Sequence, residues 1–89
     1  MQTWTVYILR CADGTFYTGI TSDLARRLQE HNEGKRLAAA YTRGRRPVCL
    51  VYREKKKNRS AAQKREAELK RLSRQEKIAM LQAAGKAKV

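Results

Sequence analysis

Hydrophobic and polar positions alternate in two short segments, residues 6–11 and 15–20, with Ala-Asp-Gly between them. A period of two is typical of β-strands, and a short linker that contains glycine predicts a tight turn. We therefore expect the two segments to form a β-hairpin. A helical pattern begins directly after them, so the hairpin is expected to lead into a helix.

The length of the hairpin turn decides which side chains share a face, because a shift of one residue moves every side chain to the other face. A two-residue turn would place Tyr7 and Tyr17 on opposite faces. A three-residue loop with Gly14 in the left-handed conformation would place Tyr7 opposite Gly19 and both tyrosines on one face. We favour the second register, because it leaves the other face more continuously apolar. One face then carries Tyr7, Leu9, Cys11, Thr15, Tyr17, Gly19 and Thr21, and the other carries Val6, Ile8, Arg10, Phe16, Thr18 and Ile20.

The segment after the hairpin is predicted to be an amphipathic helix. Ser22 is expected to cap its N-terminus, with Asp23 in the first turn, and Gly34 is expected to end it. Leu24 and Leu28 lie one turn apart and mark the stripe that is buried.

The polar side chains of this helix divide by their angle around the helix axis. Arg27 and His31 fall beside the leucine stripe, one turn apart, whereas Arg26 and Glu30 are expected to point away from it. Arg27 is therefore predicted to be directed inward.

A continuous apolar run at residues 48–52 has the length of a strand and follows Pro47. Such a run fits a strand covered on both faces and paired with the hairpin. The charged run at residues 54–59 is predicted to be a turn, with cations that are solvated or, as the alternative, contact phosphate.

Two capping boxes predict that two helices complete the chain. Ser60 with Gln63 begins the first, and Ser73 with Glu76 begins the second, each with a hydroxyl three residues before a Gln or Glu. The second helix is expected to direct Ile78, Met80, Leu81 and Ala84 toward the core and to end at Gly85. The order β-β-α-β-α-α predicts an α+β fold class in one domain that covers residues 1–89.

One acidic residue lies on the inward stripe of the first of these helices. Glu66 shares that stripe with Ala62 and Leu69. Burying an unpaired carboxylate is costly, so Glu66 should face a cation. An ion pair with Lys70 or Arg65 and a bound metal ion are both open on the sequence alone.

Composition narrows the class of partner. The 89 residues carry a formal net charge of +13 with a pI near 10.5, which indicates a polyanionic partner and favours nucleic acid over anionic lipid. No stretch approaches the roughly 20 apolar residues of a spanning helix, so no membrane association is expected. The chain begins without a charged leader and hydrophobic signal core, so we expect a cytoplasmic protein.

Cysteine and histidine usage argues against a disulfide or a zinc site. Cys11 and Cys49 both lie in apolar strand patterns and are expected to be buried, reduced thiols. The chain has no C-x-x-C pair, and His31 is its one histidine.

The connection at residues 34–47 is rich in arginine and too long for a tight turn. It is either a solvated basic loop or an arm that follows a nucleic-acid backbone. We favour the arm, because the planar guanidinium suits bidentate contacts to phosphate. Its candidate nucleic-acid contacts are Lys35, Arg36, Tyr41, Arg43, Arg45 and Arg46.

The hairpin and helix together resemble a known family. Val6-Tyr7, then Tyr17-Thr18-Gly19 about ten residues later, then Arg27 and His31 on a helix, look like the GIY-YIG nuclease family, with Thr5 and Thr18 departing from its two signature tripeptides. The length and layout match small single-domain bacterial members. The resemblance covers almost the whole chain and implies a three-stranded antiparallel sheet flanked by helices.

The resemblance also implies a catalytic set and a metal ion. Glu66 matches the metal ligand of small members, and Mg²⁺ or Mn²⁺ would be the cofactor. The chemistry of phosphodiester hydrolysis assigns the roles: Arg27 would offset phosphoryl charge, and Tyr7 or Tyr17 would orient or deprotonate the water. We favour Tyr7 as the base and Tyr17 as the residue that holds the scissile phosphate. His31 is an alternative base or a hydrogen-bond partner of a reacting oxygen, since an ordinary histidine pKa suits either task.

Two functions from different classes remain open at this level. The first is a metal-dependent DNA endonuclease, structure-selective in repair or recombination, with RNA not excluded as a substrate. The second is a nucleic-acid-binding module that keeps the fold and cleaves little. We expect a monomer in solution; because one site cuts one strand, a dimer on the substrate is an open alternative.

Overall fold

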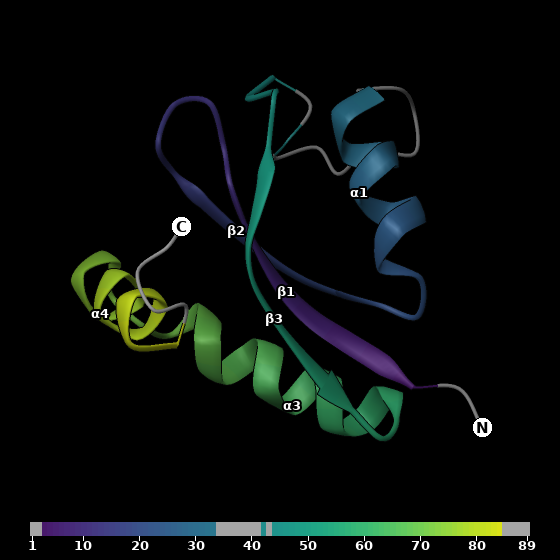
Figure 1. Ribbon diagram of the computed structural model, residues 1–89. Coiled ribbons are helices and arrows are strands. Elements are labelled where there is room, and N and C mark those ends of the chain that lie inside the picture. The colour runs from purple at the N-terminus through teal and green to yellow at the C-terminus, as the bar shows by residue number, and fades with distance from the viewer. Residues whose placement is uncertain (1–2, 34–41, 43, 85–89) are drawn as a thin grey trace.

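The computed structural model describes residues 3–33, 42 and 44–84 and has an α+β architecture (Figure 1). Its three strands form one antiparallel sheet in the order β2-β1-β3, and three described helices flank the sheet. The predicted order β-β-α-β-α-α is confirmed. The elements are β1 (Trp4–Arg10), β2 (Phe16–Thr21), α1 (Leu24–Glu33), β3 (Cys49–Lys56), α3 (Arg59–Lys70) and α4 (Arg74–Ala84).

The hairpin of β1 and β2 has the register that the sequence favoured. Tyr7 pairs with Gly19, and Leu9 pairs with Tyr17. The turn is a three-residue loop in which Gly14 has a φ of 84°, a left-handed conformation that glycine adopts without strain. Tyr7 and Tyr17 therefore lie on the same face.

Strand β3 pairs with β1 and is longer than the apolar run predicted. It continues to Lys56, so the predicted turn at residues 54–59 is wrong in its first half. Glu54 explains the extension, because its carboxylate pairs with Lys56 at 2.6 Å and with Arg65 of α3 at 3.0 Å. Alternate residues of the strand can thus be charged without leaving the sheet, as is common at a sheet edge.

The two faces of the sheet are covered by different helices (Figure 1). The face with Tyr7 packs against α1, and the opposite face packs against α3 and α4. The buried apolar residues on the α1 side are Tyr7, Leu9, Cys11 and Val48, with Tyr17, Leu24, Leu28 and Leu50 partly buried against them. Those on the α3 side are Val6, Ile8, Ala62, Leu69 and Leu81.

Helix α1 is capped by Asp23 and not by Ser22. The Asp23 carboxylate accepts a hydrogen bond from the backbone N–H of Arg26 at 3.1 Å, and the Thr21 hydroxyl accepts one from the N–H of Asp23 at 3.0 Å. The capping residue is thus one position later than predicted, because Thr21 ends β2 and holds Asp23 in place. The expected end at Gly34 lies outside the described residues.

Helix α3 is also capped by a residue other than the predicted one. The Asn58 side chain accepts a hydrogen bond from the N–H of Ala61 at 2.8 Å, so the helix begins before Ser60. The second capping box is confirmed: the N–H of Ser73 donates to the Glu76 carboxylate at 2.8 Å, and the N–H of Glu76 donates to the Ser73 hydroxyl at 3.1 Å.

Asn32, in the last turn of α1, fixes the start of β3. Its side-chain amide donates to the carbonyl of Val48 at 3.1 Å and accepts from the N–H of the same residue at 2.8 Å.

Both cysteines are free, but only Cys11 is buried; Cys49 is exposed, contrary to the expectation from its apolar neighbours.

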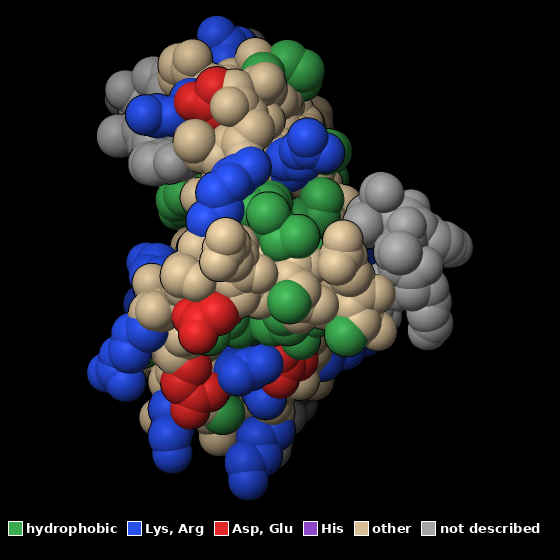
Figure 2. Space-filling view, turned by 90° about the vertical axis from the view of Figure 1, so that its left-hand side faces the viewer, with side chains coloured by type: hydrophobic (Ala, Val, Ile, Leu, Met, Phe, Trp, Pro, Cys, Tyr) green, Lys and Arg blue, Asp and Glu red, His purple; other side chains and the backbone are tan. Residues whose placement is uncertain are grey.

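Helix α4 leaves part of the sheet accessible. Leu81 is buried as predicted, while Ile78 lines a pocket of about 330 Å³ with Phe16 and Val51. The Arg74 guanidinium lies 5.2 Å from the centre of the Phe16 ring. Figure 2 shows hydrophobic side chains gathered at the middle of this side of the molecule, bordered by Lys and Arg. The predicted end of α4 at Gly85 and the side chain of Ala84 lie outside the part that the structure describes.

Candidate active site

Three aromatic rings meet on the α1 face of the sheet. Tyr7 and Tyr17 come from the hairpin, and His31 comes from α1. The ring centroid of Tyr17 lies 5.1 Å from that of His31, and the centroid of Tyr7 lies 6.4 Å and 6.0 Å from those of Tyr17 and His31. The two strands and the helix therefore converge as the sequence predicted for these three residues.

Gly19 makes the close approach of the two tyrosines feasible. A Cβ at this position would lie 2.6 Å from the phenol oxygen of Tyr7 and 3.1 Å from Cε2 of Tyr17. The Tyr7 side chain thus lies over the bare backbone of its cross-strand partner. A glycine here is required for space, because its own φ is not in the left-handed region.

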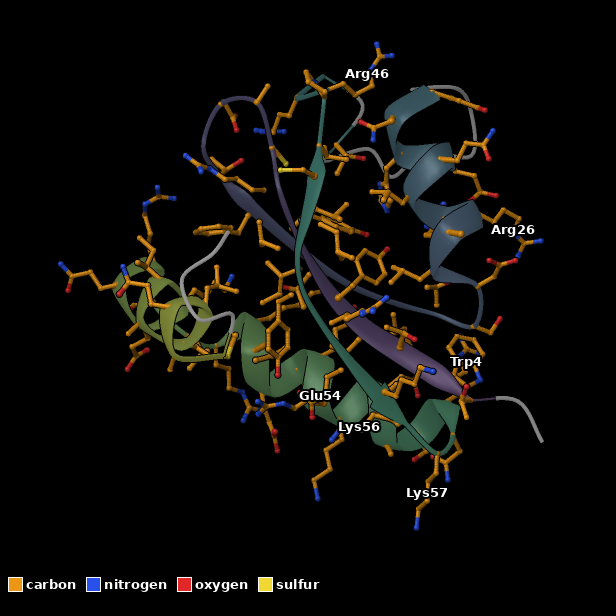
Figure 3. All side chains as sticks on the ribbon, in the orientation of Figure 1. Trp4, Arg26, Arg46, Glu54, Lys56 and Lys57 are labelled. Atoms are coloured by element: carbon orange, nitrogen blue, oxygen red, sulfur yellow. The ribbon has the colours of Figure 1, made fainter. Side chains whose placement is uncertain are left out.

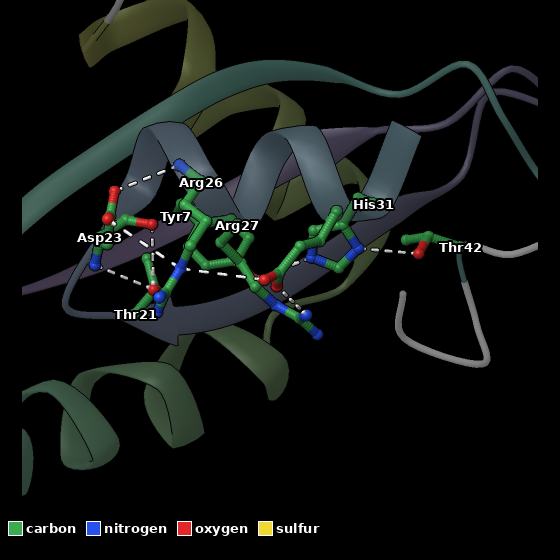
Figure 4. A network of polar contacts seen from close by, with 8 residues as sticks. Tyr7, Thr21, Asp23, Arg26, Arg27, His31 and Thr42 are labelled. Carbon is green, nitrogen blue, oxygen red and sulfur yellow. Dashed lines mark hydrogen bonds and ion pairs between the residues drawn. The ribbon is translucent and has the colours of Figure 1, made fainter. Parts of the chain in front are cut away.

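A buried chain of polar groups runs from β1 through α1 to Thr42 (Figure 4). The phenol oxygen of Tyr7 lies 3.0 Å from Nε2 of His31, and Nδ1 of His31 lies 2.8 Å from the hydroxyl oxygen of Thr42. The three residues are 1%, 0% and 0% exposed. Thr42 was missed by sequence reasoning, since it lies in the basic connection, where no periodicity marks a buried position.

Burial sets the protonation states of this chain. It raises the pKa of Tyr7 to about 12; Tyr17 adds to the rise, and hydrogen bonding to Arg27 opposes it. Burial, with the nearby charge of Arg27, lowers the pKa of His31 to about 4. Both groups are therefore neutral at pH 7. The expectation that His31 keeps an ordinary pKa was wrong. For the Tyr7 phenol, desolvation outweighs the effect of Arg27, which lowers its pKa.

Arg27 joins this group from α1 and is directed inward as predicted. Its side chain is 25% exposed, and it hydrogen-bonds to Tyr7. Its Nη1 donates to the Glu30 carboxylate at 2.8 Å. Glu30 was expected to point away, but its side chain is only 20% exposed and also lies 3.8 Å from Arg26, which is 68% exposed. Glu30 is thus, after Thr42, another residue of the site that the sequence analysis did not identify, because its angle around the helix axis predicted an outward position.

Glu66 lies on α3, the helix on the other side of the sheet. Its side chain is 22% exposed, and its carboxylate lies 3.2 Å from Nζ of Lys70. Of the two ion pairs left open by the sequence, the Lys70 pair forms, while Arg65 pairs with Glu54 and Glu68. The negative charge of Glu66 acts on Tyr7, where it adds to the larger effects of burial in raising the phenol pKa.

The donor set suits a hard divalent cation held by one carboxylate. Within the described ranges no three His, Cys, Asp or Glu side chains come together as a metal cage. Glu66 offers a partly exposed oxygen ligand, and Mg²⁺ is commonly held by one or two carboxylates with water and substrate phosphate completing its octahedron. Glu66 therefore fits a magnesium or manganese ion, with Lys70 as the group that competes for the carboxylate.

The predicted basic arm is only partly described. Arg45 pairs with Asp13 of the hairpin turn at 3.0 Å, and Arg46 donates to the backbone carbonyl of Glu33 at 3.2 Å. Both therefore lie at the turn end of the hairpin and the C-terminal end of α1. In Figure 3, Arg46 lies at the opposite end of the molecule from Trp4 and Lys57. The other candidates, Lys35, Arg36, Tyr41 and Arg43, lie outside the described residues.

Comparison with known proteins gives a consistent result. The GIY-YIG catalytic domain family matches residues 3–79. A UPF0213 protein of Desulfotalea psychrophila is 54% identical over 83 residues, which are 93% of this chain and 74% of that protein. No helix in the described part of the chain has the length and hydrophobicity to span a bilayer.

Two structures solved by solution NMR share the fold. The UPF0213 protein BH0048 from Bacillus halodurans is 42% identical, with a TM-score of 0.58, over 91% of this chain and 84% of the other. The protein EF2693 from E. faecalis is 39% identical, with a TM-score of 0.63, over 96% of this chain and 88% of the other. The similarity thus covers most of this chain in both structures.

Proposed function

The chain belongs to the GIY-YIG catalytic domain family, a nuclease family with nucleic-acid substrates, and on that premise we propose that it is a divalent-metal-dependent DNA endonuclease. The observation that carries the proposal is the convergence of Tyr7, Tyr17, His31 and Arg27 on one face of the sheet. A face built only for packing would not direct an arginine and a buried hydrogen-bonded histidine toward two phenols.

The accessible groups of the site are those that would bind the scissile phosphate. Arg27 and Tyr17 are partly exposed, whereas Tyr7 and His31 lie beneath them. The guanidinium would offset the charge that develops on the phosphoryl oxygens, and the Tyr17 hydroxyl would donate a hydrogen bond to one of them. Glu30, which pairs with Arg27, would hold the guanidinium in position.

Tyr7 and His31 would act as a proton-transfer pair. With a pKa of about 12 the phenol is protonated at neutral pH, so it can take a proton from water only as its own proton leaves. Nε2 of neutral His31, 3.0 Å away, is in place to accept that proton. The resulting imidazolium would lie beside an anionic phosphate, which offsets the burial that lowers its pKa.

Glu66 would hold the Mg²⁺ or Mn²⁺ ion. When bound, such an ion offsets charge on the phosphoryl oxygens and on the leaving oxygen. The chain itself supplies one carboxylate, and Lys70 would have to release that carboxylate to the ion.

We propose that the enzyme recognises nucleic-acid structure more than sequence, as repair and recombination nucleases do. A domain of 89 residues has little surface left for reading a long sequence. One site cuts one strand, so a double-strand break would take two copies or two encounters. A non-catalytic binding module is the second candidate; the buried state of Tyr7, at 1% exposure, is the observation that favours it.

The test is cleavage of labelled single-stranded, duplex, flapped and nicked DNA with Mg²⁺ or Mn²⁺. Arg27→Ala and Glu66→Ala are each expected to lower cleavage by about 100-fold or more while DNA binding persists. Matched controls are Arg26→Ala, one residue away on the exposed side of α1, and Glu68→Ala, which removes one of the two carboxylates that pair with Arg65. Binding without cleavage, or cleavage that Arg27→Ala and Glu66→Ala leave unchanged, would favour the binding module.

A further inference from the structure

The register of β3 places two cations on the same face as the candidate active site. Arg53 is the cross-strand partner of Tyr7, and Lys55 is the partner of Thr5. Directly opposed residues of an antiparallel pair direct their side chains to the same face, with Cβ atoms about 5 Å apart. Arg53 and Lys55 are therefore on the α1 face, while Glu54 and Lys56 between and beside them are on the α3 face.

Within the described part of the chain, the charged side chains of β3 form ion pairs on one face of the sheet but not on the other. On the α3 face, Glu54 pairs with Lys56 at 2.6 Å and with Arg65 at 3.0 Å (Figure 3). On the α1 face, neither Arg53 nor Lys55 has an ion-pair partner among the residues that the structure describes, and both are exposed. One strand thus carries a neutralised side and a side with two free positive charges.

These two cations continue a row that crosses the sheet through the site. Gly19 on β2, Tyr7 on β1 and Arg53 on β3 are in register, and β3 is an edge strand, so the row opens to solvent at Arg53. Thr21, Thr5 and Lys55 form the next row. Neighbouring phosphates of a nucleic-acid strand held at Tyr17 and Arg27 would meet Arg53 and then Lys55.

We propose that Arg53 and Lys55 form a phosphate-binding track that holds the nucleic-acid backbone next to the scissile phosphate. The proposal rests on the proposed function for the position of the substrate, and it adds a contact surface on β3. The track is separate from Arg45 and Arg46 of the basic connection, which lie beside the hairpin turn.

The experiment measures binding of fluorescein-labelled single-stranded and duplex DNA by anisotropy, in EDTA so that no cleavage occurs, over a range of NaCl concentrations. The test protein is Arg53→Ala/Lys55→Ala. The control is Lys64→Ala/Arg71→Ala, which removes the same charges from exposed positions on α3 and its C-cap. Melting curves of all three proteins confirm that they are folded.

In the test variant, the slope of log K against log[salt] is expected to become less steep by about 2, because each phosphate contact contributes about 0.9 to its steepness. DNA binding by this variant is expected to be roughly 10-fold or more weaker. The control is expected to change the slope by less than about 0.5, because surface charges far from the backbone release few counterions. Equal changes in both variants, or no change in the test variant, would overturn the proposal.

Failure of the track and failure of the proposed function are distinguishable. In one outcome, Arg53→Ala/Lys55→Ala makes DNA binding less dependent on salt, and the wild-type protein cleaves no DNA. The track then stands, and the nuclease proposal fails. If the wild-type protein cleaves DNA but its binding does not depend on these residues, the nuclease proposal stands and the track is wrong.

Discussion

The two faces of this small sheet pack different kinds of side chain. On the α3 face, aliphatic residues from β1 and the helices pack together, with Val6, Ile8 and Leu69 all fully buried. On the α1 face, the same strand contributes Tyr7, which is buried against a histidine. Along β1, Val6 and Ile8 thus point into the hydrocarbon core, while Tyr7 between them points toward the polar group on the other face. The α1 face has an apolar cluster of its own, but unlike the α3 face it also holds neutral, hydrogen-bonded aromatic groups where function needs them.

The largest effect on stability is expected from the α3 face. Leu69→Ala removes a fully buried side chain and should lower the free energy of unfolding by about 2–5 kcal/mol. Below the melting transition the variant should cleave DNA at about the wild-type rate, because Leu69 belongs to the apolar cluster of the α3 face and not to that of the α1 face. Urea denaturation and cleavage at low temperature measure the two effects. A large loss of cleavage in the folded variant would mean that the faces are not independent.

The faces should also respond to acid at different pH. The unfolded chain protonates His31 near pH 6.5, but the folded protein does so near pH 4, so stability is full above pH 6.5 and falls as the pH drops toward 4. The loss is up to about 3 kcal/mol. Glu54 differs: burial raises its pKa, but hydrogen bonds from Lys56, Tyr52 and Arg65 lower it to about 2, so its contribution is lost between about pH 4.5 and 2.

Melting temperatures recorded from pH 7 down to pH 4 would show this first loss. A His31→Gln variant is expected to flatten the curve in that window and leave the more acidic part unchanged. A wild-type curve that stays flat down to pH 4 would contradict the neutral, buried state of His31.

Gly19→Ala should damage the site face more than the fold. The new Cβ would lie 2.6 Å and 2.8 Å from two atoms of the Tyr7 side chain, so the phenol must move. We expect a cost of about 1–3 kcal/mol in stability and, because a shift of about 1 Å in a reacting group is costly, about a 100-fold loss of cleavage. Gly44→Ala, where a Cβ meets nothing within 4 Å, is the matched control. Equal activities in the two variants would show that the position of Tyr7 is not critical.

The same isosteric change should have opposite signs on the two faces. Thr42→Val removes the hydroxyl that hydrogen-bonds His31 and should cost about 1–3 kcal/mol. Thr18→Val removes a buried hydroxyl on the α3 face for which the structure shows no hydrogen-bond partner among the described residues, and should stabilise the protein by up to about 1 kcal/mol. Chemical denaturation of both variants measures the pair. Destabilisation by Thr18→Val would show that its hydroxyl is solvated or bonded in solution.

Much of the fold followed from local patterns in the sequence. The alternation in residues 6–11 and 15–20, with Gly14 in the linker, was sufficient to fix the hairpin register and hence the face shared by Tyr7 and Tyr17. The helical spacing of Arg27 and His31 was sufficient to direct both inward. These predictions succeeded because each depends on residues close together in the chain.

Two of the predictions that failed, the length of β3 and the pKa of His31, depend on contacts that lie beyond the local sequence. The length of β3 depends on Arg65, eleven positions from Glu54. The lowered pKa of His31 likewise comes from packing that no local pattern shows. Ser22 and Asp23 are both good caps, and the choice between them was made by the end of β2 at Thr21.

The most direct test of the account removes one phenol oxygen from each face of the sheet. Tyr7→Phe and Tyr52→Phe make the same change on neighbouring strands, and each hydroxyl has a partner, His31 for Tyr7 and Glu54 for Tyr52. With Mg²⁺ and flapped DNA as substrate, we expect Tyr7→Phe to lower cleavage by about 100-fold or more, since proton transfer typically contributes that much. Tyr52→Phe should stay within about threefold of wild type, as expected away from a site. Equal cleavage by the two variants would contradict the assignment of the chemistry to the α1 face.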